Sequence, residues 1–509
     1  MNKRVITFLA GVSILSGLHA QTSQPEEMAF RVKEEAFSNS RIDSLAHFMT
    51  DKLGPRLAAS KMKLRAEQLV AQQLRNYGFE NVRIEKATDF AKGGWDNEKN
   101  YVAMTAPYYC SFAANPKAWS GSTDGLVKGE CVVLDASELS DLAKYSGKLR
   151  GKIVLMAPTR EYKLSFEPLA SRLTDEELEE MKTDQRTISR SGRPRMDYSK
   201  VRAFRAALDS IIKAEAPIAV ISGDGMFNIP GSRGVSYKSG NPEPIPEIAL
   251  PIEDHGRMVR LINGGDKVEM ELDIKNVFSE NPQINNVIAE IPGTDPKLKN
   301  EVVLLGGHLD SWHGGTGAED NAAGCITMIE ALRILKALGV KPRRTIRVAL
   351  WGGEEQGLYG SRGYADNYLF SNSDKKKLPD YDNFALYLNS DFGSGRFRGI
   401  YLEENDMAFP YFEAWKKPLE SLGFTTLSPQ KMGSTDHVTF NRLGLPSYQF
   451  IPDPLDYFRT YHTTMDTYER LVSDDLKINA AIVAWLAYSA AMDNGRIPVK
   501  SGYPERLSK

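Results

Sequence analysis

The sequence predicts an α/β protein with a central mixed, mostly parallel sheet flanked by helices and with an inserted β-rich domain. From residue 285 onward, apolar strand-like runs alternate with helical segments, which is typical of a parallel sheet. Between residues 129 and 280, short strand-like runs follow one another instead. The chain has 509 residues, which is too long for one ordinary hydrophobic core. Together these observations predict more than one domain.

The first residues have the pattern of a cleavable signal peptide, predicted to span residues 1–20. Lys3 and Arg4 precede an apolar run that extends from Val5 to Leu18. A membrane anchor would need about 20 apolar residues, and this run is shorter. We therefore expect an exported protein, secreted or periplasmic, with no membrane partner after cleavage.

Residues 21–125 are predicted to form the N-terminal part of the main domain. Amphipathic helical patterns begin after Ser40 and after Ser60, and they end at Gly54 and Gly78. Residues 126–280 are predicted to be the inserted β-rich domain, with the runs CVVLDA, KIVLMAP, PIAVISG, EIALPI and VEMELDI. The charged segment EELEEMK interrupts these runs, and its spacing is typical of a solvated helix face rather than of a binding tail.

Residues 281–496 are predicted to complete the main domain, and residues 497–509 to be a tail. The strand-like runs in this part are NVIAEIPG, EVVLLGGHLD, TIRVALW, FALYLNSD and SYQFI. They are continuously apolar, as buried parallel strands are. A helix is expected from Ala322 to Leu338, ending at Gly339.

Composition limits the classes of partner and the disulfide content. The formal net charge of −2 gives no support to a nucleic-acid partner, which requires a basic surface. The three cysteines, Cys110, Cys131 and Cys325, allow at most one intrachain disulfide. Cys325 lies in a helical pattern beside the candidate site, so Cys110 and Cys131 are the expected pair.

Polar clusters stand at the expected ends of several strands. They contain His308, Asp310, Glu354, Glu355, Asp391 and His462. In open α/β sheets, sites form at the carboxyl ends of the strands. Imidazole nitrogens and carboxylate oxygens are ligands that zinc takes. The sequence therefore predicts a metal site at this edge of the sheet.

The spacing within each cluster indicates a role. His308 and Asp310 point the same way on a strand, so Asp310 can accept the second ring N–H of His308 and orient it. Asp320 lies in GAEDNAAG just before a helix, where it could bind metal or cap the helix. Glu354 and Glu355 diverge beyond their strand, so one can bind metal while the other faces the attacking water, unless both are simply solvated.

Signatures of other catalytic classes are missing from the sequence. The chain has no H-E-x-x-H motif, no G-x-S-x-G motif and no P-loop. Asp391-Phe392-Gly393 matches a kinase tripeptide, but neither an H-R-D motif nor a glycine-rich partner accompanies it. We therefore interpret this tripeptide as a coincidence.

The motifs GGHLDSW, GAEDNAAG, LWGGEEQG, LNSDFG and YHTTMDT occur in this order between residues 285 and 466. Together they resemble the co-catalytic dizinc metallopeptidases of family 28, which include aminopeptidases and glutamate carboxypeptidases. The likeness is greatest to carboxypeptidase Q-like members. It implies the zinc exopeptidase fold and identifies the inserted stretch as similar to a protease-associated domain.

The resemblance also implies two zinc ions (Zn2+) per chain. One ion would be held by His308 and Asp391, the other by Glu355 and His462, and Asp320 would bridge both. Glu354 corresponds to the general base of the family, and Tyr461 to the residue that stabilises the oxyanion. Asp310 orients His308, while a structural role is favoured for His437, in the segment STDH.

The implied activity is that of an exopeptidase acting on a peptide or dipeptide substrate. An aminopeptidase or dipeptidase is favoured, and a carboxypeptidase of the glutamate carboxypeptidase type is the alternative. Arg396 and Arg398 could bind a terminal carboxylate, although a solvated loop pair is the simpler account. The full ligand set argues against a glutaminyl cyclase or a non-catalytic, receptor-like binding module. Homodimer formation stays open, as does a role of the inserted domain in dimer contacts or in restricting access to the site.

Overall fold

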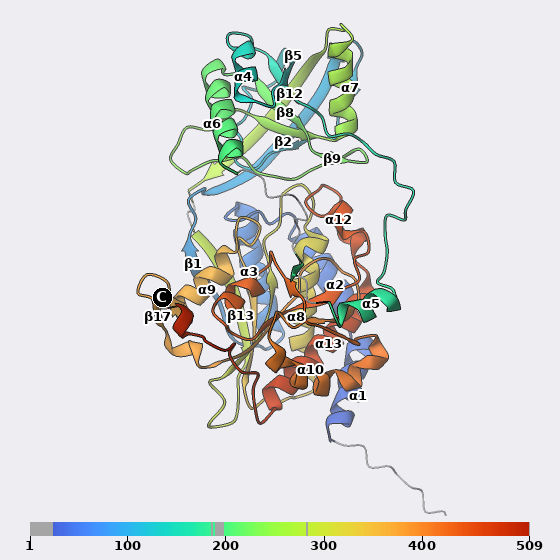
Figure 1. Ribbon diagram of the computed structural model, residues 1–509, viewed down its shortest axis with the longest axis vertical. Helices are drawn as coiled ribbons and strands as arrows, with labels where there is room; N and C mark the ends of the chain where they lie inside the picture. Colours follow the sequence, from blue (N-terminus) through green and yellow to red (C-terminus); the bar gives the residue numbers. More distant parts are fainter. Residues whose placement is uncertain (1–23, 185–186, 189–197, 281–282, 508–509) are drawn as a thin grey trace, which may run out of the picture.

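The computed structural model describes residues 24–184, 187–188, 198–280 and 283–507. The predicted signal peptide lies outside the described residues. Within the described part of the chain, no helix is long and apolar enough to cross a membrane. Two sheets of eight strands each form the centres of two units that lie one above the other (Figure 1). We call them the lower unit, which contains the predicted site, and the upper unit.

The sheet of the lower unit is mixed, as predicted. Its order is β1-β13-β15-β14-β18-β22-β19-β20, and the four central strands β15, β14, β18 and β22 are mutually parallel. The strands are β1 (Glu80–Asp89), β13 (Gln283–Ile291), β14 (Val302–His308), β15 (Thr345–Trp351), β18 (Phe384–Asn389), β19 (Phe397–Tyr401), β20 (Thr426–Ser428) and β22 (Ser447–Pro452).

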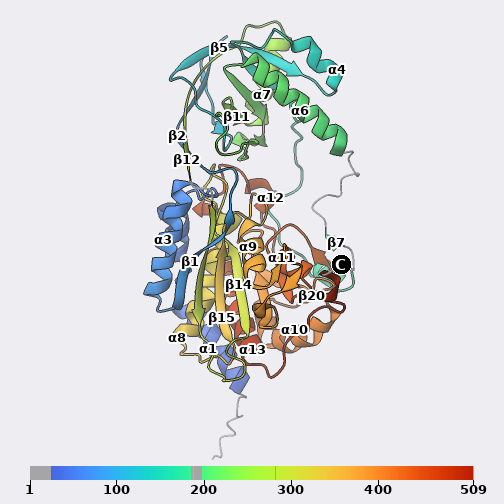
Figure 2. The same cartoon turned by 90° about the vertical axis from the view of Figure 1, so that its left-hand side faces the viewer.

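Helices cover both faces of this sheet, because the apolar side chains of each strand alternate between two cores. On β14, Val303 and Leu305 face one core, whereas Leu304 faces the other. The first core is closed by α1 (Gln24–Ser38), α2 (Ile42–His47), α3 (Lys61–Asn76), α8 (Ala323–Ala337), α10 (Phe409–Lys416) and α13 (Ser473–Met492). The second is closed by α9 (Tyr359–Tyr368) and α11 (His437–Arg442). Figure 2 shows the sheet between α3 and α9.

The predicted helices of the lower unit are confirmed. Ser60 caps α3, because its side chain accepts a hydrogen bond from the backbone N–H of Lys63. Gly78 and Gly339 follow α3 and α8 with φ of 75° and 68°, a conformation that favours glycine at a helix end. Helix α1 has no counterpart among the predicted elements.

The upper unit contains the second sheet, in the order β3-β2-β12-β5-β6-β8-β11-β4. Its strands are β2 (Gly94–Ala106), β3 (Cys110–Ser111), β4 (Asn115–Pro116), β5 (Val127–Asp135), β6 (Ile153–Ala157), β8 (Ala219–Gly223), β11 (Glu247–Leu250) and β12 (Glu269–Ser279). The helices are α4 (Leu139–Leu142), α6 (Tyr198–Glu215) and α7 (Ile252–Asn263). Three strands precede residue 126, so this sheet extends further toward the N-terminus than the predicted boundary.

Two further expectations concern the upper unit and the segment that leaves it. All of the segment EELEEMK except its last residue lies in α5 (Asp175–Met181), a largely exposed helix in which only Leu178 is buried, as predicted. The expected disulfide between Cys110 and Cys131 is wrong, because all three cysteines are free. Strands β2 and β12 lie between β3 and β5 and separate the two thiols.

Candidate metal centre

Four adjacent parallel strands bring the predicted clusters to one edge of the lower sheet. His308 is the last residue of β14, Glu354 and Glu355 follow the end of β15, and Asp391 follows the end of β18. His462 follows β22 after the short helix α12 (Tyr457–Thr460). The carboxyl ends of neighbouring parallel strands meet at one edge, and this arrangement explains why distant motifs converge.

The carboxylate of Asp320 lies between the two histidines. Its Oδ1 is 3.1 Å from His308 Nε2, and its Oδ2 is 3.0 Å from His462 Nε2. Asp391 Oδ1 lies 3.8 Å from His308 Nε2, and Glu355 Oε2 lies 2.8 Å from His462 Nε2. The five side chains therefore form two groups, each with one imidazole and one carboxylate, that share Asp320.

This donor set fits divalent metal ions such as zinc. Ligand atoms of His308, Asp320 and Glu355 all lie within 4.8 Å of one another. Glu355 Oε1 is buried without a hydrogen-bond partner among the described residues, so one ligand atom remains unsatisfied by the protein. Nitrogen and oxygen donors at two positions match the preferences of zinc.

The electrostatics of the site favour positive charge among its carboxylates. Burial lowers the pKa of His308, but hydrogen bonds and charges from Asp320 and Asp391 outweigh it and raise that pKa well above the ordinary value. For Asp320, burial is likewise outweighed, because His308 and His462 hold its pKa well below the ordinary value. The site thus stabilises either protonated imidazoles or a bound cation.

Glu354 and Glu355 have a different environment from Asp320. Burial, together with the charges of Asp391 and Glu355, raises the pKa of Glu354 well above the ordinary carboxylate value, although His308 opposes the shift. Burial and the charge of Asp320 raise the pKa of Glu355 to about 7. A carboxyl group with a raised pKa is suited to taking up and releasing protons near neutral pH.

Asp310 contacts His308 with a different atom from the one expected. The Nδ1 atom of His308 is 2.9 Å from the backbone carbonyl of Asp310, whereas the carboxylate is 3.8 Å away. The carboxylate instead accepts the backbone N–H groups of Glu354 and Glu355, at 3.1 and 3.3 Å. Asp310 therefore connects the ends of β14 and β15 as well as orienting His308.

Comparison with known protein families finds a match in the segment that contains the site residues. Residues 286–487 match the family described as Peptidase family M28. Residues 286–487 belong to peptidase family M28. Carboxypeptidase Q from Bos taurus is 28% identical over 444 residues, which cover 87% of this chain and 83% of the relative. Aminopeptidase YwaD from Bacillus subtilis is 29% identical over 260 residues, which cover 50% of this chain and 53% of the relative.

Solved structures of other proteins have a fold similar to that of this chain. The Peptidase M28 precursor from Shewanella amazonensis has a TM-score of 0.66 and 24% identity, and the match covers 93% of this chain and 98% of that one. BSAP, a zinc aminopeptidase from Bacillus subtilis, has a TM-score of 0.55 and 20% identity, with 91% and 97% covered. The match includes most of both units, so the two-unit architecture is shared.

Tyr461 and His437 are the remaining residues considered in the sequence. Tyr461 precedes His462, and its ring stacks on Tyr457 with centroids 5.0 Å apart. His437 is buried, and its Nε2 contacts Glu403 Oε1 at 3.1 Å, in agreement with the structural role favoured for it.

The two candidate carboxylate-binding arginines are already paired. Arg396 contacts Asp475 at 3.3 Å, and Arg398 contacts Asp453 at 3.1 Å. Arg172, which lies in the segment between β6 and α5, pairs with both of these aspartates at 2.7 Å. The arginines therefore belong to an ion-pair cluster that attaches this segment to the lower unit.

Three further residues support the site and were not singled out from the sequence. Trp312 donates its indole N–H to Glu355 Oε2 at 2.9 Å. Asp466 accepts the backbone N–H groups of Glu319 and Asp320. Trp312 and Asp466 stand inside the motifs GGHLDSW and YHTTMDT, so those motifs contained the signal.

The third supporting residue, Arg56, lies outside the motifs that contain the other site residues. Its buried guanidinium donates to five backbone carbonyls, including those of Leu309 at 2.7 Å, Thr316 at 2.6 Å and Gly317 at 2.8 Å. Arg56 therefore connects the start and the end of the loop between His308 and Asp320. Every residue has a backbone carbonyl, so these contacts do not select particular residue types, and no signal in the sequence pointed to Arg56.

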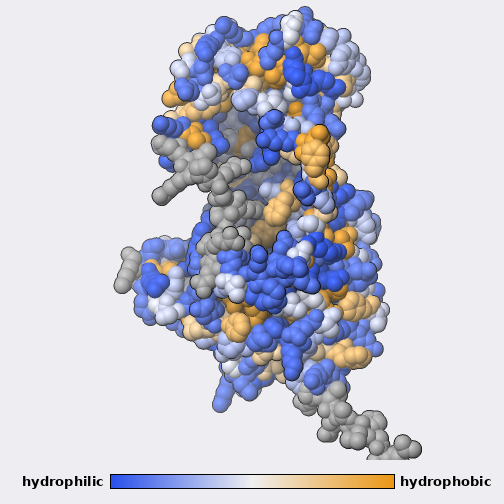
Figure 3. Space-filling model, turned by 45° about the vertical axis from the view of Figure 1, so that its right-hand side comes forward, coloured by the Kyte–Doolittle hydropathy of each residue, from blue (hydrophilic) through white to orange (hydrophobic). Residues whose placement is uncertain are grey.

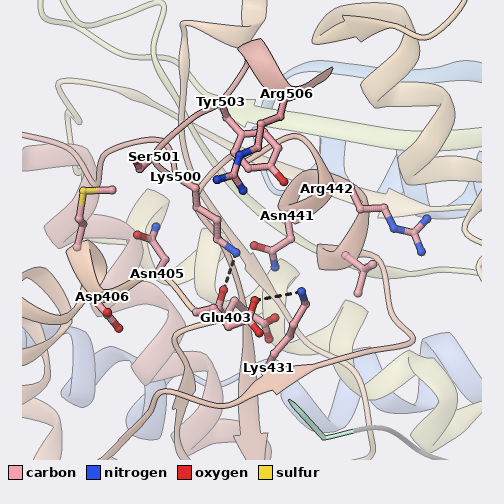
Figure 4. Close-up of a pocket in the computed structure, with 13 residues that line it drawn as sticks. Glu403, Asn405, Asp406, Lys431, Asn441, Arg442, Lys500, Ser501, Tyr503 and Arg506 are labelled. Carbon is pink, nitrogen blue, oxygen red and sulfur yellow. Dashed lines mark hydrogen bonds and ion pairs between the residues drawn. The ribbon is translucent and has the colours of Figure 1, made fainter. Parts of the chain in front are cut away.

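A sizeable cavity lies away from the metal centre. It has a volume of about 710 Å³ and lies between the tail residues around Lys500 and the segment around Glu403 (Figure 4). Lys500 Nζ donates to the carbonyl of Glu403 at 2.5 Å, and Lys431 pairs with Glu404 at 3.2 Å. None of the predicted site residues lines this cavity. Asp320, Glu355 and His462 line a separate, much smaller hollow of about 10 Å³. Figure 3 shows that the molecular surface is also hollowed between the two units.

Proposed function

We propose that this M28 peptidase is an exported, two-zinc exopeptidase that acts as an aminopeptidase or dipeptidase. The observation that carries the proposal is the carboxylate of Asp320, whose two oxygens face His308 and His462 separately. Under this proposal one zinc ion is held by His308 and Asp391, the other by Glu355 and His462, and Asp320 serves both. The zinc aminopeptidase among the similar structures supports the choice of metal.

When bound, a pair of zinc ions supplies Lewis acidity, which lowers the pKa of a water molecule and polarises the scissile carbonyl. Glu354 accepts the proton of the attacking water and donates it to the leaving amine. The burial that raises the pKa of Glu354 makes its carboxylate a stronger base, which favours this transfer. Tyr461, beside His462, stabilises the oxyanion that forms on the substrate.

The position of the arginines favours a free amino end over a free carboxyl end as the recognised group. Arg and Lys are strong ligands for a terminal carboxylate, and the two candidate arginines, Arg396 and Arg398, are already paired with Asp475 and Asp453. Carboxypeptidase activity remains the second candidate, because the carboxypeptidase Q relatives match 87% of this chain. Export follows from the pattern of residues 1–20, and we assign the upper unit to the protease-associated class.

A panel of peptides with free, N-blocked and C-blocked ends tests this proposal. We expect hydrolysis of peptides with a free amino end, loss of activity with a chelator, and recovery when zinc is added. Metal analysis should find two zinc ions per chain. Cleavage of N-blocked but not of C-blocked peptides would show carboxypeptidase polarity instead. Activity that persists in chelator would contradict the metal mechanism itself.

A further inference from the structure

The upper unit touches the loop that carries His462. Its hairpin of β9 (Gly225–Met226) and β10 (Ile229–Pro230) continues into Ser232, whose backbone N–H donates to the carbonyl of His462 at 2.7 Å. Thr464 donates its backbone N–H to the carbonyl of Pro230 at 3.3 Å, and Gly231 forms an antiparallel bridge with Thr463. Three consecutive residues of the loop are therefore paired with the upper unit as in a short strand.

The hairpin is itself held in place by its own unit. Asn115, in β4, donates its side-chain amide to the carbonyl of Gly231 at 3.0 Å. The backbone N–H of Gly231 donates to the carbonyl of Asp224 at 2.9 Å. A Cβ on Gly231 would lie 2.7 Å from Asp224 Cγ, so a larger residue here would have to displace the Asp224 side chain. The segment is therefore a fixed part of the upper unit.

Ser232 also fixes the loop that follows His308. Its side chain is buried, and Oγ accepts the backbone N–H of Gly314 at 3.0 Å. His313 Nδ1 lies 3.4 Å from the same Oγ, while its Nε2 donates to the carbonyl of Pro116 at 2.6 Å. One serine of the upper unit thus contacts both loops that flank the metal centre.

His462 needs this support, because its backbone has an unfavourable conformation. Its φ is 53°, a left-handed value that is unfavourable for a residue other than glycine. Such a conformation persists where surrounding contacts determine it. The carbonyl of His462 is held by Ser232, while its Nε2 faces Asp320 and Glu355.

We propose that Ser232 is a positioning residue of the metal centre, and that the upper unit thereby completes the zinc site rather than only covering it. The backbone N–H of Ser232 keeps the peptide of His462 in the orientation that points its imidazole at Asp320 and Glu355. Without this hydrogen bond, the loop can relax from the left-handed conformation at His462. The imidazole then moves away from the zinc position that it shares with Glu355. This inference rests on the proposed function, in which His462 binds zinc.

Ser232→Pro tests the inference, because proline removes the backbone N–H and the preceding Gly231 tolerates the restriction that proline imposes. Zinc affinity is measured by competition with a chromophoric chelator, and folding by circular dichroism. We expect one of the two zinc ions to bind 10- to 100-fold more weakly while the other is retained. Ser232→Ala keeps the N–H and should keep both affinities within a few-fold.

Ser146→Pro is the matched control, since Ser146 lies in the upper unit with φ of −58°, which suits proline. It should bind zinc like the unchanged protein. If Ser232→Pro does not fold, Asn115→Ala decides the question, because it releases Gly231 and should weaken the same zinc ion. Two unchanged zinc affinities in a folded variant would overturn the inference. Absence of zinc from the unchanged protein would instead overturn the proposed function.

Discussion

The indole N–H of Trp312 and the imidazole of His462 meet at one oxygen of Glu355. Trp312 Nε1 donates to Glu355 Oε2 at 2.9 Å, and His462 Nε2 lies 2.8 Å from the same atom. The rings of Trp312 and His462 also pack edge to face, with centroids 6.0 Å apart. A residue that bonds to a metal ligand fixes the orientation of that ligand. Trp312 therefore determines how Glu355 is presented to a metal ion.

Trp312→Phe should weaken zinc binding, because phenylalanine keeps most of the aromatic packing but cannot donate a hydrogen bond. We expect a 10- to 100-fold lower affinity for one zinc ion, measured by chelator competition. Trp485→Phe is the control: Trp485 lies in α13 and donates to the carbonyl of Trp415, away from the site. Equal zinc affinity in both variants would show that the indole hydrogen bond does not orient Glu355.

Glu354→Gln should abolish turnover while zinc is retained. Glutamine has a similar shape but cannot take up the proton of the attacking water, so we expect kcat to fall by about 10²- to 10⁴-fold. Zinc content, measured by elemental analysis, should stay near two per chain. Glu404→Gln, at the remote cavity of Figure 4, should leave kcat unchanged. Substantial activity in Glu354→Gln would assign the base elsewhere.

Asp320→Ala should weaken both metal positions, because the two oxygens of this carboxylate face different histidines. Asp391→Ala removes a carboxylate that lies beside His308. We therefore expect elemental analysis to find loss of both zinc ions from the first variant and loss of one from the second. Identical stoichiometry in the two variants would contradict the bridging role of Asp320.

Zinc binding should release protons and strengthen as pH rises. Burial lowers the pKa of His462, but Glu355 and Asp320 outweigh it and raise that pKa to about 11 in the metal-free protein. At neutral pH the metal-free imidazole therefore carries a proton that zinc must displace. Calorimetry in buffers of different ionisation enthalpy should detect this release, and apparent affinity should increase from pH 6 to pH 8. Binding without proton release would contradict the expectation.

The upper unit should lose stability in mild acid through His255. Burial lowers the pKa of this side chain from 6.5 to about 4. The unfolded chain then takes up a proton below pH 6.5 while the folded protein does not, so stability falls between pH 6.5 and 4. The loss is on the order of 3 kcal/mol, from roughly 1.4 kcal/mol per pKa unit.

His255→Gln removes this titration and should make the unfolding free energy less dependent on pH. Urea unfolding at pH 7 and pH 5, followed by circular dichroism, measures the difference. His47→Gln, a change at an exposed helix position, should keep the pH dependence of the unchanged protein. An equally steep loss of stability in His255→Gln would assign the acid sensitivity to other groups.

Much of the lower unit could be predicted from the sequence, because its signals are local. The apolar runs of β14, β15 and β18 and the caps of α3 and α8 involve neighbouring residues, whose spacing determines the element. The candidate ligands could be found for the same reason, since each stands at the end of such a run. The candidate ligands could also be expected to lie close together, because the carboxyl ends of neighbouring parallel strands meet at one edge of a sheet.

Other features depend on contacts between distant parts of the chain. The separation of Cys110 from Cys131 follows from two strands that insert between β3 and β5. The membership of β2 in the upper sheet is decided by its pairing with β12.

By itself, the sequence determined the fold class of the lower unit and the set of candidate ligands. Tertiary structure decided how these ligands are held: Trp312 bonds to Glu355, and Ser232 holds the carbonyl of His462. Patterns of neighbouring side chains encode helices and strands, because those elements depend on local spacing. A hydrogen bond between backbone groups 230 residues apart requires no particular side chain at either end, so it leaves no trace in the sequence.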